Sequence, residues 1–205
     1  MTEMLQDASR PLAEQSGVTD AMLLADNREL SVEVARLRLR VLELERMADT
    51  DPMLSVYNRR AFMREVRRAQ VVMSRYDILS TVVYFDLDGF KAVNDRYGHA
   101  IGDQLLARVS EVLQAGVRDC DMVARLGGDE FGVLLFKSGV EIARAKAGVL
   151  SCRLGQIGLD HPDGRVGISA SWGVAPCEPD DTPEAVLDRA DRAMYLSKGA
   201  PVAPK

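Results

Sequence analysis

Apolar residues recur every seven positions in the N-terminal quarter of the chain. Leucine fills one position of the repeat and a mostly β-branched residue fills the position four places later: Leu23, Leu30, Leu37 and Leu44, with Asn27, Val34, Val41 and Ala48. Leucine at d with β-branched residues at a favours parallel two-stranded coiled coils. In such a dimer Glu33 would face Arg38 and Arg40 would face Glu45, and both pairs are opposite in charge.

We therefore predict a parallel dimeric coiled coil over residues 21–50. The alternative is a single amphipathic helix packed on the rest of the protein. Residues 1–20 are polar, include Pro11 and Gly17 and have no sustained period, so we expect a flexible N-terminal arm there. Pro52 cannot continue a helix and ends the predicted coil.

Beyond Pro52 the pattern changes to short segments with helical or strand periods. Asn58 is a suitable N-cap for a helix whose apolar face is Phe62, Val66, Ala69 and Met73. The further elements predicted are a strand over 81–86, helices over 90–96 and 102–115, a hairpin over 122–136, a helix over 140–154, a strand over 166–174 and a helix over 182–198. This order predicts an α+β fold with a central antiparallel or mixed sheet flanked by helices.

The predicted hairpin carries an acidic turn. Apolar runs on both sides enclose Arg125-Leu126-Gly127-Gly128-Asp129-Glu130-Phe131. Paired glycines favour a hairpin because they tolerate the positive φ of tight turns. Adjacent carboxylates at a strand end suit a hard divalent cation that bridges to phosphates. Taken alone, this pattern also fits an ordinary acidic turn.

A second group of polar residues follows the predicted strand over 81–86. The strand continues into Phe85-Asp86-Leu87-Asp88-Gly89-Phe90-Lys91-Ala92-Val93-Asn94-Asp95, and Tyr97-Gly98-His99 and Gly102-Asp103 come soon after. Together with the hairpin motif, these residues resemble the GGDEF family of diguanylate cyclases, which condense two GTP into cyclic di-GMP. The resemblance covers a palm-like nucleotidyl cyclase domain over residues 51–199 and leaves residues 200–205 as a C-terminal tail.

Composition limits the other possibilities. The chain has 205 residues, 47% of them apolar, which is enough for one domain with an extension. A net charge of −5 argues against a nucleic acid partner. Three cysteines without metal-ligand spacing favour free thiols in a reducing compartment. No apolar run approaches the length of about 20 residues that a membrane span needs, so we expect a cytoplasmic protein.

The resemblance implies a metal centre and a catalytic group built from the same acids. Asp86, Asp129 and Glu130, with the Leu87 carbonyl, would hold one or two Mg²⁺ or Mn²⁺ ions. The three acids are also the candidate catalytic residues. Glu130 is the candidate for easing deprotonation of the attacking 3′-hydroxyl, although the sequence leaves open which acid does so.

The resemblance also implies a GTP site. Asn94 and Asp103 match the residues that read guanine, since a carboxylate accepts from N1 and N2 and an amide contacts O6 or N3. The other substrate-binding candidates are Phe90, Lys91, Gly127, Gly128 and Lys198. Family members commonly have an arginine after the last helix that contacts phosphate, and this chain has none there; Lys205 or a partner chain could replace it.

An inhibitory site is implied by Arg118 and Asp121, which match the family's Arg-x-x-Asp motif for cyclic di-GMP. Arg144 is a weak candidate for a second arginine of that site.

Three hypotheses remain from the sequence. The first is an active cyclase with product inhibition, dimerised by its coil. The second is a catalytically weak or inactive effector that binds cyclic di-GMP, although intact Asp86, Asp129 and Glu130 argue against it. The third is an interaction protein that acts through the coil. An adenylyl cyclase is a poorer match, because adenine would not suit Asp103 as a binding partner.

Overall fold

The computed structural model describes residues 12–198, and two compact units divide between Ala48 and Asp49. The first unit contains helix α1 (Leu12–Asp49) except for its last residue. This helix begins earlier than the predicted coil, because Leu, Ala, Glu and Gln at positions 12–15 are strong helix formers. Residues 12–20 of the expected arm are therefore helical, whereas residues 1–11 lie outside the described residues, as does the tail over residues 200–205.

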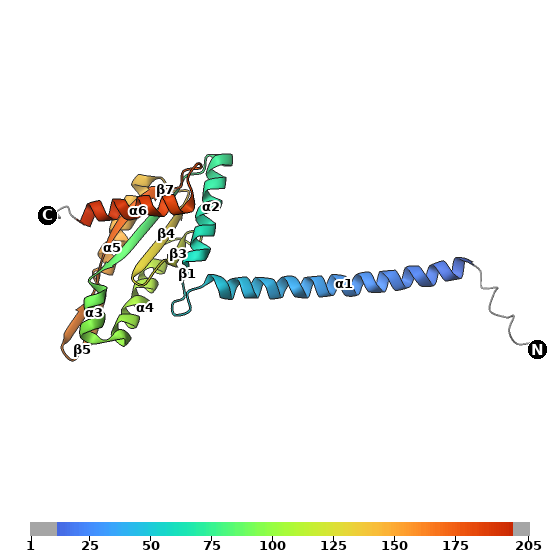
Figure 1. Ribbon diagram of the computed structural model, residues 1–205, viewed down its shortest axis with the longest axis horizontal. Helices are drawn as coiled ribbons and strands as arrows, with labels where there is room; N and C mark the ends of the chain where they lie inside the picture. The colour runs from blue at the N-terminus through green and yellow to red at the C-terminus, as the bar shows by residue number, and fades with distance from the viewer. Residues whose placement is uncertain (1–11, 199–205) are drawn as a thin grey trace, which may run out of the picture. The chain divides into compact units, whose positions relative to one another are not determined.

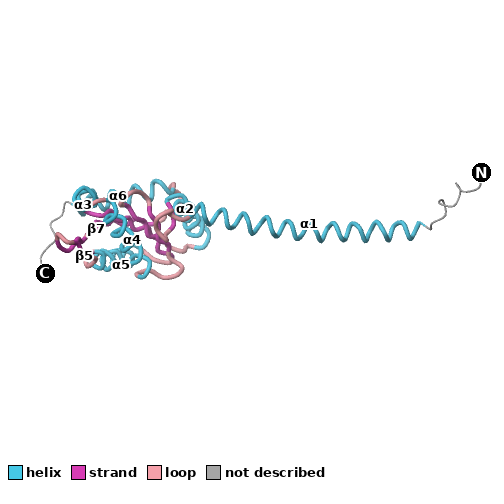
Figure 2. Tube along the Cα trace, turned by 90° about the horizontal axis from the view of Figure 1, so that it is seen from below, coloured by secondary structure: helices cyan, strands magenta, loops and turns pink. Residues whose placement is uncertain are grey.

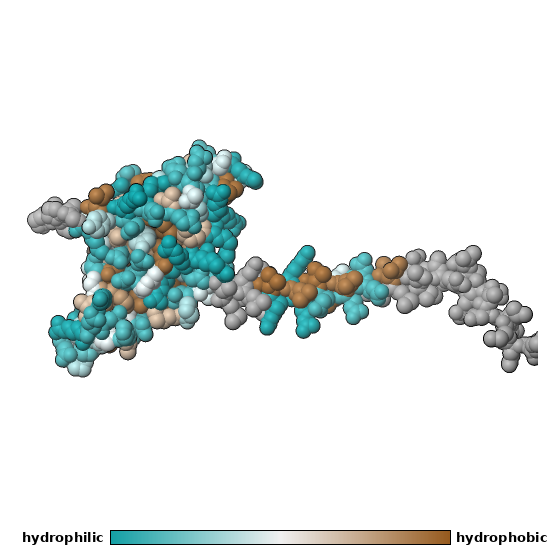
Figure 3. Space-filling model, viewed as in Figure 1, coloured by the Kyte–Doolittle hydropathy of each residue, from teal (hydrophilic) through white to brown (hydrophobic). Residues whose placement is uncertain are grey.

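The predicted seam of α1 is exposed in the single chain. Leu23, Leu30, Val34, Leu37 and Val41 all present apolar side chains to solvent, and Figure 3 shows apolar surface along the described part of this helix. None of the helices within residues 12–198 has the length and apolar character needed to cross a membrane.

The second unit is built on a five-stranded mixed sheet with the order β1-β3-β4-β2-β7. Its strands are β1 (Tyr57–Asn58), β2 (Ser80–Asp88), β3 (Met122–Arg125), β4 (Glu130–Phe136) and β7 (Ser169–Pro176). Only the short pair β1 and β3 is parallel among the pairs described; β3 with β4, β4 with β2 and β2 with β7 are antiparallel. Strand β2, which lies between β4 and β7, is buried for almost its whole length.

Helices cover both faces of this sheet. Helices α2 (Arg59–Tyr76) and α6 (Pro183–Lys198) bury one face around Phe62, Tyr84 and Leu187. Helices α3 (Phe90–Tyr97), α4 (His99–Ala115) and α5 (Val140–Leu154) bury the other around Phe85 and Leu106. Figures 1 and 2 show strands between α2 and α6 on one side and α4 and α5 on the other. The result is the palm-like arrangement expected, with a mixed sheet.

Local signals in the sequence explain how several of these elements begin. The Asn58 side chain accepts a hydrogen bond from the Ala61 amide at the start of α2, which confirms the predicted N-cap. Thr182 Oγ1 accepts one from the Ala185 amide in the first turn of α6. Helix α5 has the bounds predicted from the sequence.

Two predictions were wrong in detail. The single strand expected over 166–174 is split between β6 (Gly164–Gly167) and β7, and β6 pairs with β5 (Gly158–His161) in a separate two-stranded sheet. Alternation of apolar residues continues through Ile168, so periodicity alone could not locate the break. The hairpin turn over residues 126–129 also does not use positive φ, which among the described glycines occurs only at Gly89, Gly98 and Gly164.

Candidate active site

The carboxylates predicted to act together meet at one end of β2. Asp86 on β2 lies directly opposite Glu130 on β4 in the antiparallel register. Opposed residues of an antiparallel pair project from the same face, with Cβ atoms about 5 Å apart. The Leu87 amide donates to the Asp129 carbonyl oxygen at 3.2 Å, which ties the hairpin turn to the end of β2. The fold therefore gathers Asp86, Asp129 and Glu130.

The electrostatics at Asp129 reflect this crowding of negative charge. Burial raises the pKa of Asp129 above its ordinary value, and repulsion from Asp86 and Glu130 raises it further. A bound cation would relieve that repulsion, and carboxylate oxygens are the ligands that Mg²⁺ and Mn²⁺ prefer. The donor set therefore fits a hard divalent cation in type. The side-chain positions in this structure do not yet form a metal site, because residues 12–198 contain no cluster of three or more His, Cys, Asp or Glu side chains arranged to hold a metal.

Lys198 explains part of that arrangement. Its ammonium group hydrogen-bonds to Asp86 Oδ2 and lies 3.4 Å from Asp88 Oδ1. The contact with Asp86 raises the pKa of Lys198. A predicted substrate-binding lysine thus neutralises a predicted metal ligand in the structure.

Glu130 is held by residues around the hairpin. A Cβ on Gly127 would overlap Glu130 Oε2, so Gly127 provides space for the Glu130 carboxylate. Burial and a hydrogen bond with Glu130 raise the pKa of Tyr84, which keeps this phenol protonated. Tyr84 is two residues before Asp86 on β2, and no feature of the pattern along the chain assigned it to the site.

The predicted guanine site contains a buried acceptor without a partner. Asn94 Oδ1 on α3 is buried and has no hydrogen-bond partner in the structure. The Asn94 side chain packs against Gly102, where a Cβ would overlap it. Because an unsatisfied buried acceptor is costly, Asn94 is poised to accept a hydrogen bond from a ligand. Asp103, next to Gly102, is exposed on α4, Phe90 is buried beside Gly102, and Lys91 is exposed.

Arg125 fixes the hairpin turn from the side. Its guanidinium donates from Nε to the Gly127 carbonyl oxygen at 3.0 Å and from Nη2 to the Gly128 carbonyl oxygen at 2.8 Å. Its Nη1 atom lies 3.5 Å from Asp51 Oδ1. Arg125 belongs to the hairpin motif, but its role depends on a contact with Asp51 that spacing along the chain does not indicate.

Asp88 was also not predicted as a site side chain. Ser169 Oγ donates to Asp88 Oδ2 at 2.9 Å and Ser171 Oγ donates to Asp88 Oδ1 at 2.8 Å. Both serines belong to β7, which pairs with β2 so that Ser169 faces Asp88 and Ser171 faces Asp86. The small alternating residues of β7 were visible in the sequence, but the register that aligns them with Asp88 was not.

The predicted inhibitory pair is already formed as an internal ion pair. Arg118 donates from Nε and Nη2 to the two oxygens of Asp121 at 3.0 and 2.9 Å, and its Nη2 also donates to the Phe136 carbonyl oxygen. The Asp121 side chain is 0% exposed and that of Arg118 is 54% exposed. Burial acts to raise the pKa of Asp121, but hydrogen bonds from Arg118 and the Phe136 amide outweigh it and lower the pKa. Arg144 is exposed on α5.

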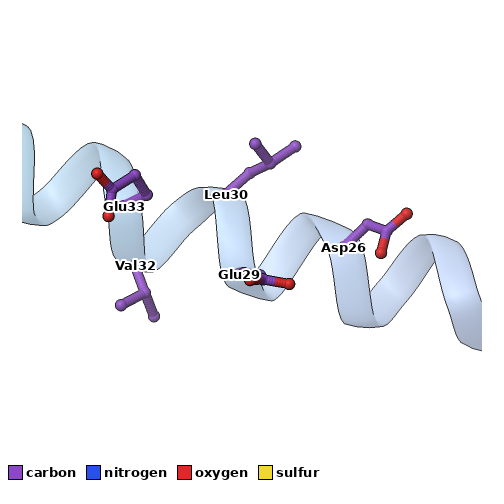
Figure 4. Close-up of a pocket in the computed structure, with 5 residues that line it drawn as sticks. All are labelled: Asp26, Glu29, Leu30, Val32 and Glu33. Carbon is purple, nitrogen blue, oxygen red and sulfur yellow. The ribbon is translucent and has the colours of Figure 1, made fainter.

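A pocket on α1 shares no residue with the groups described above. It is lined by Asp26, Glu29, Leu30, Val32 and Glu33. All five side chains come from one helix, and Figure 4 shows that they point away from it in different directions. They do not converge on a common point, so we assign no ligand site there.

Known proteins match the unit that carries these residues. The profile of the family described as "Diguanylate cyclase, GGDEF domain" matches residues 48–201. Diguanylate cyclase TpbB from Pseudomonas aeruginosa (strain UCBPP-PA14) is 38% identical over 174 residues, which cover 83% of this chain and 40% of that protein. Diguanylate cyclase DgcZ from Escherichia coli (strain K12) is 37% identical over 118 residues, 57% of this chain and 40% of that protein. The chain thus spans about 40% of the length of these curated relatives.

Solved structures agree with the fold. The coiled coil and GGDEF domain of DgcB from Caulobacter crescentus, in complex with c-di-GMP, superposes with a TM-score of 0.73 at 28% identity, covering 86% of this chain and 94% of that one. The GGDEF domain of TpbB from Pseudomonas aeruginosa gives a TM-score of 0.66 at 37% identity, covering 73% of this chain and 88% of that one. The match to the family profile extends over well more than half of the sequence and includes the acidic strand end and the hairpin, and the chain therefore belongs to the GGDEF family of diguanylate cyclase domains.

Proposed function

We propose that this protein is an active diguanylate cyclase that condenses two GTP molecules into cyclic di-GMP and releases two pyrophosphates. The observation that carries the proposal is the register that sets Asp86 opposite Glu130, with Asp129 in the adjoining turn. A protein that only binds cyclic di-GMP would have no need of three mutually repelling carboxylates at one strand end.

The reaction requires positioning and charge neutralisation more than covalent catalysis. The 3′-oxygen of each GTP attacks the α-phosphorus of the other, loses its proton, and displaces pyrophosphate. Glu130 is the candidate for easing the loss of that proton, and Gly127 leaves the space that its carboxylate occupies.

A divalent cation, Mg²⁺ or Mn²⁺, would supply positive charge against the triphosphate. Asp86, Asp129, Glu130 and the Leu87 carbonyl would hold it. The raised pKa of Asp129 supports this assignment, because its cause includes the two neighbouring carboxylates that a cation would neutralise.

Guanine recognition falls to the corner between α3 and α4. The unpartnered Asn94 Oδ1 can accept from a guanine amino group, and Asp103 can accept from N1 and N2. Phe90 and Lys91 begin α3 directly after Gly89. Gly128 has open space around it and permits close approach of the nucleotide from the hairpin, while Gly127 leaves room for the Glu130 carboxylate. A site of this kind rejects adenine, because adenine would leave its acceptors unpaired.

Two copies of the domain are needed because the product joins two substrates symmetrically. The exposed apolar positions of α1 support a parallel coiled-coil homodimer. The DgcB structure is described as that of a coiled coil and a GGDEF domain, and its match covers 86% of this chain, which supports the proposal. A cytoplasmic location follows from the proposed use of GTP.

Product inhibition is proposed at Arg118 and Asp121. The DgcB structure was determined in complex with c-di-GMP, and the exposed guanidinium of Arg118 could bind a guanine edge. Since Asp121 is fully buried and bound to Arg118, its contribution would be to orient Arg118.

The deciding experiment compares cyclic di-GMP formation by wild-type protein and Glu130→Gln, with GTP and Mg²⁺, after removal of any carried nucleotide. Gln keeps the size of the side chain and can still hydrogen-bond to Tyr84, so loss of the charge is the main change. We expect turnover in wild type to fall roughly 100-fold or more in the variant. The matched control is Glu111→Gln, because Glu111 is an exposed acid on α4 paired with Arg108, and its turnover should be unchanged.

Absence of turnover in wild type would reject the cyclase. If the same protein bound cyclic di-GMP and Arg118→Ala abolished that binding, the chain would instead be a cyclic di-GMP effector.

A further inference from the structure

The carboxylate of Asp88 is held in one orientation by hydroxyl groups on the neighbouring strand. Each of its oxygens accepts a hydrogen bond from one serine: Oδ2 from Ser169 and Oδ1 from Ser171. Oδ1 is also the atom that lies 3.4 Å from Lys198 Nζ. A pair of uncharged donors leaves the negative charge of Asp88 in place, so the fixed carboxylate can still attract the ammonium group.

Lys198 is delivered to this point by a rigid contact between α6 and β7. Gly173 on β7 lies so close to α6 that a Cβ there would overlap the Ala190 carbonyl oxygen and the Met194 amide. Ser197 Oγ, in the last turn, lies 3.2 Å from the Trp172 carbonyl oxygen, and its shorter hydrogen bond, at 2.7 Å, is to the Met194 carbonyl oxygen of the same helix. Because the backbone of α6 is fixed on β7, only the side chain of Lys198 is free to change its partner.

The two carboxylates that contact Lys198 differ in what else they are expected to bind. Asp86 belongs to the proposed metal ligands, and a cation there would repel the ammonium group. Asp88 is directed toward β7 by its two serines and keeps its charge available to Lys198.

We infer that Asp88, oriented by Ser169 and Ser171, is a positioning residue that retains the Lys198 ammonium at the end of β2 when Asp86 is engaged, so that Lys198 meets the phosphates of bound GTP. This inference rests on the proposed function, because it takes GTP as the ligand. Asp88 and the two serines act through Lys198 and do not touch the reacting atoms.

The test is a double-mutant cycle between the two serines and Lys198. The ligand is guanosine 5′-[α,β-methylene]triphosphate, which cannot release pyrophosphate, so its dissociation constant is measured by calorimetry without turnover. We expect Ser169→Ala/Ser171→Ala to weaken binding roughly fivefold to tenfold in the wild-type background. In a Lys198→Met background the same pair should change it by less than about twofold.

Three variants separate positioning from a general effect on the fold. Ser169→Thr/Ser171→Thr keeps both hydroxyls and should restore binding. Ser151→Ala removes a hydroxyl on α5 that donates to the carbonyl oxygen of Ala170, which lies between the two serines on β7. This variant should leave binding unchanged. Asp88→Asn keeps the shape of the side chain, and it should weaken binding of the analogue only when Lys198 is present. It therefore replaces the double alanine variant if that variant unfolds.

Steady-state kinetics give an independent measurement. We expect the serine variants to raise KM for GTP more than they lower kcat. An equal loss of affinity in both backgrounds, or no loss in the wild-type background, would overturn the inference. Wild-type protein that binds the analogue but makes no cyclic di-GMP would reject the proposed function, and the binding cycle would still decide the role of Asp88.

Discussion

At the scale of single residues, the surroundings of Asp129 in the proposed site destabilise its negative charge. Burial disfavours the ionised form of this side chain, and Asp86 and Glu130 add repulsion. A carboxyl with a raised pKa binds more protons in the folded than in the unfolded state, so its contribution to stability is present at low pH. That contribution is lost as pH rises through the folded pKa, in a window that begins near the ordinary value of 3.8 and extends upward.

We therefore predict that Asp129→Asn stabilises the metal-free protein at neutral pH, because the amide removes the repelled charge. The melting temperature should rise by roughly 2 °C, and the gain should shrink as pH falls toward 4. Thermal unfolding in the presence of a chelator, repeated over a pH series, measures both effects. Asp119→Asn is the control, since Asp119 is exposed in the loop before β3, and it should not change the melting temperature. A lower melting temperature for Asp129→Asn would contradict the prediction.

At this scale the sequence indicates which residue types form the site better than it indicates what surrounds them. The acids at the end of β2 and in the hairpin were predicted as one group from the resemblance to the GGDEF family, since α3, α4 and β3 separate β2 from β4 along the chain. Asp121 could not be predicted as a buried partner of Arg118, since that depends on the Phe136 amide 15 residues away. Gly127 was assigned to a positive φ, yet the structure uses it to make room for Glu130.

At the scale of elements, the contact between α6 and β7 controls where Lys198 lies. We predict that Gly173→Ala destabilises the protein by about 3 kcal/mol, because the new methyl group meets the backbone of α6 and cannot be accommodated by a side-chain rotation. The variant should also raise KM for GTP, since displacement of α6 moves Lys198. Urea unfolding and steady-state kinetics measure the two effects.

Gly148→Ala is the matched control for this substitution. Gly148 lies inside α5, and a Cβ there would make only ordinary van der Waals contact with Trp172. Alanine has the higher helix propensity, so we expect a gain of about 0.8 kcal/mol and unchanged KM. Equal stability changes at Gly173 and Gly148 would mean that the approach of α6 to β7 is not tight.

The elements themselves were largely predictable, because caps and periodicity are local signals. The bounds of α5 and the N-cap of α2 illustrate this. The pairing of strands was harder to predict from the sequence. Ser169 and Ser171 act on Asp88 only because β7 pairs with β2 in one particular register, and a single sequence contains no direct measure of register between strands more than 80 residues apart.

At the scale of the whole molecule, the proposed activity depends on the dimer that we propose α1 to form. In the single chain, Leu37 at a predicted d position is 55% exposed, and Leu39, two residues on, is 65% exposed. The same heptad register puts Leu39 at an f position, which faces away from the partner helix. Exposure of the free chain therefore does not distinguish these leucines, whereas dimerisation should.

We predict that Leu37→Asn raises the dissociation constant of the dimer roughly 100-fold or more, because a polar side chain from each chain would enter the apolar seam. Specific activity should then fall at low protein concentration and recover at high concentration. Leu39→Asn makes the same change in helix propensity outside the seam, so its dimerisation and activity should match wild type. Sedimentation velocity and cyclic di-GMP assays over a range of protein concentrations measure both variants. Equal effects of the two substitutions, or activity that does not depend on concentration in Leu37→Asn, would exclude the parallel coil as the device that pairs the domains.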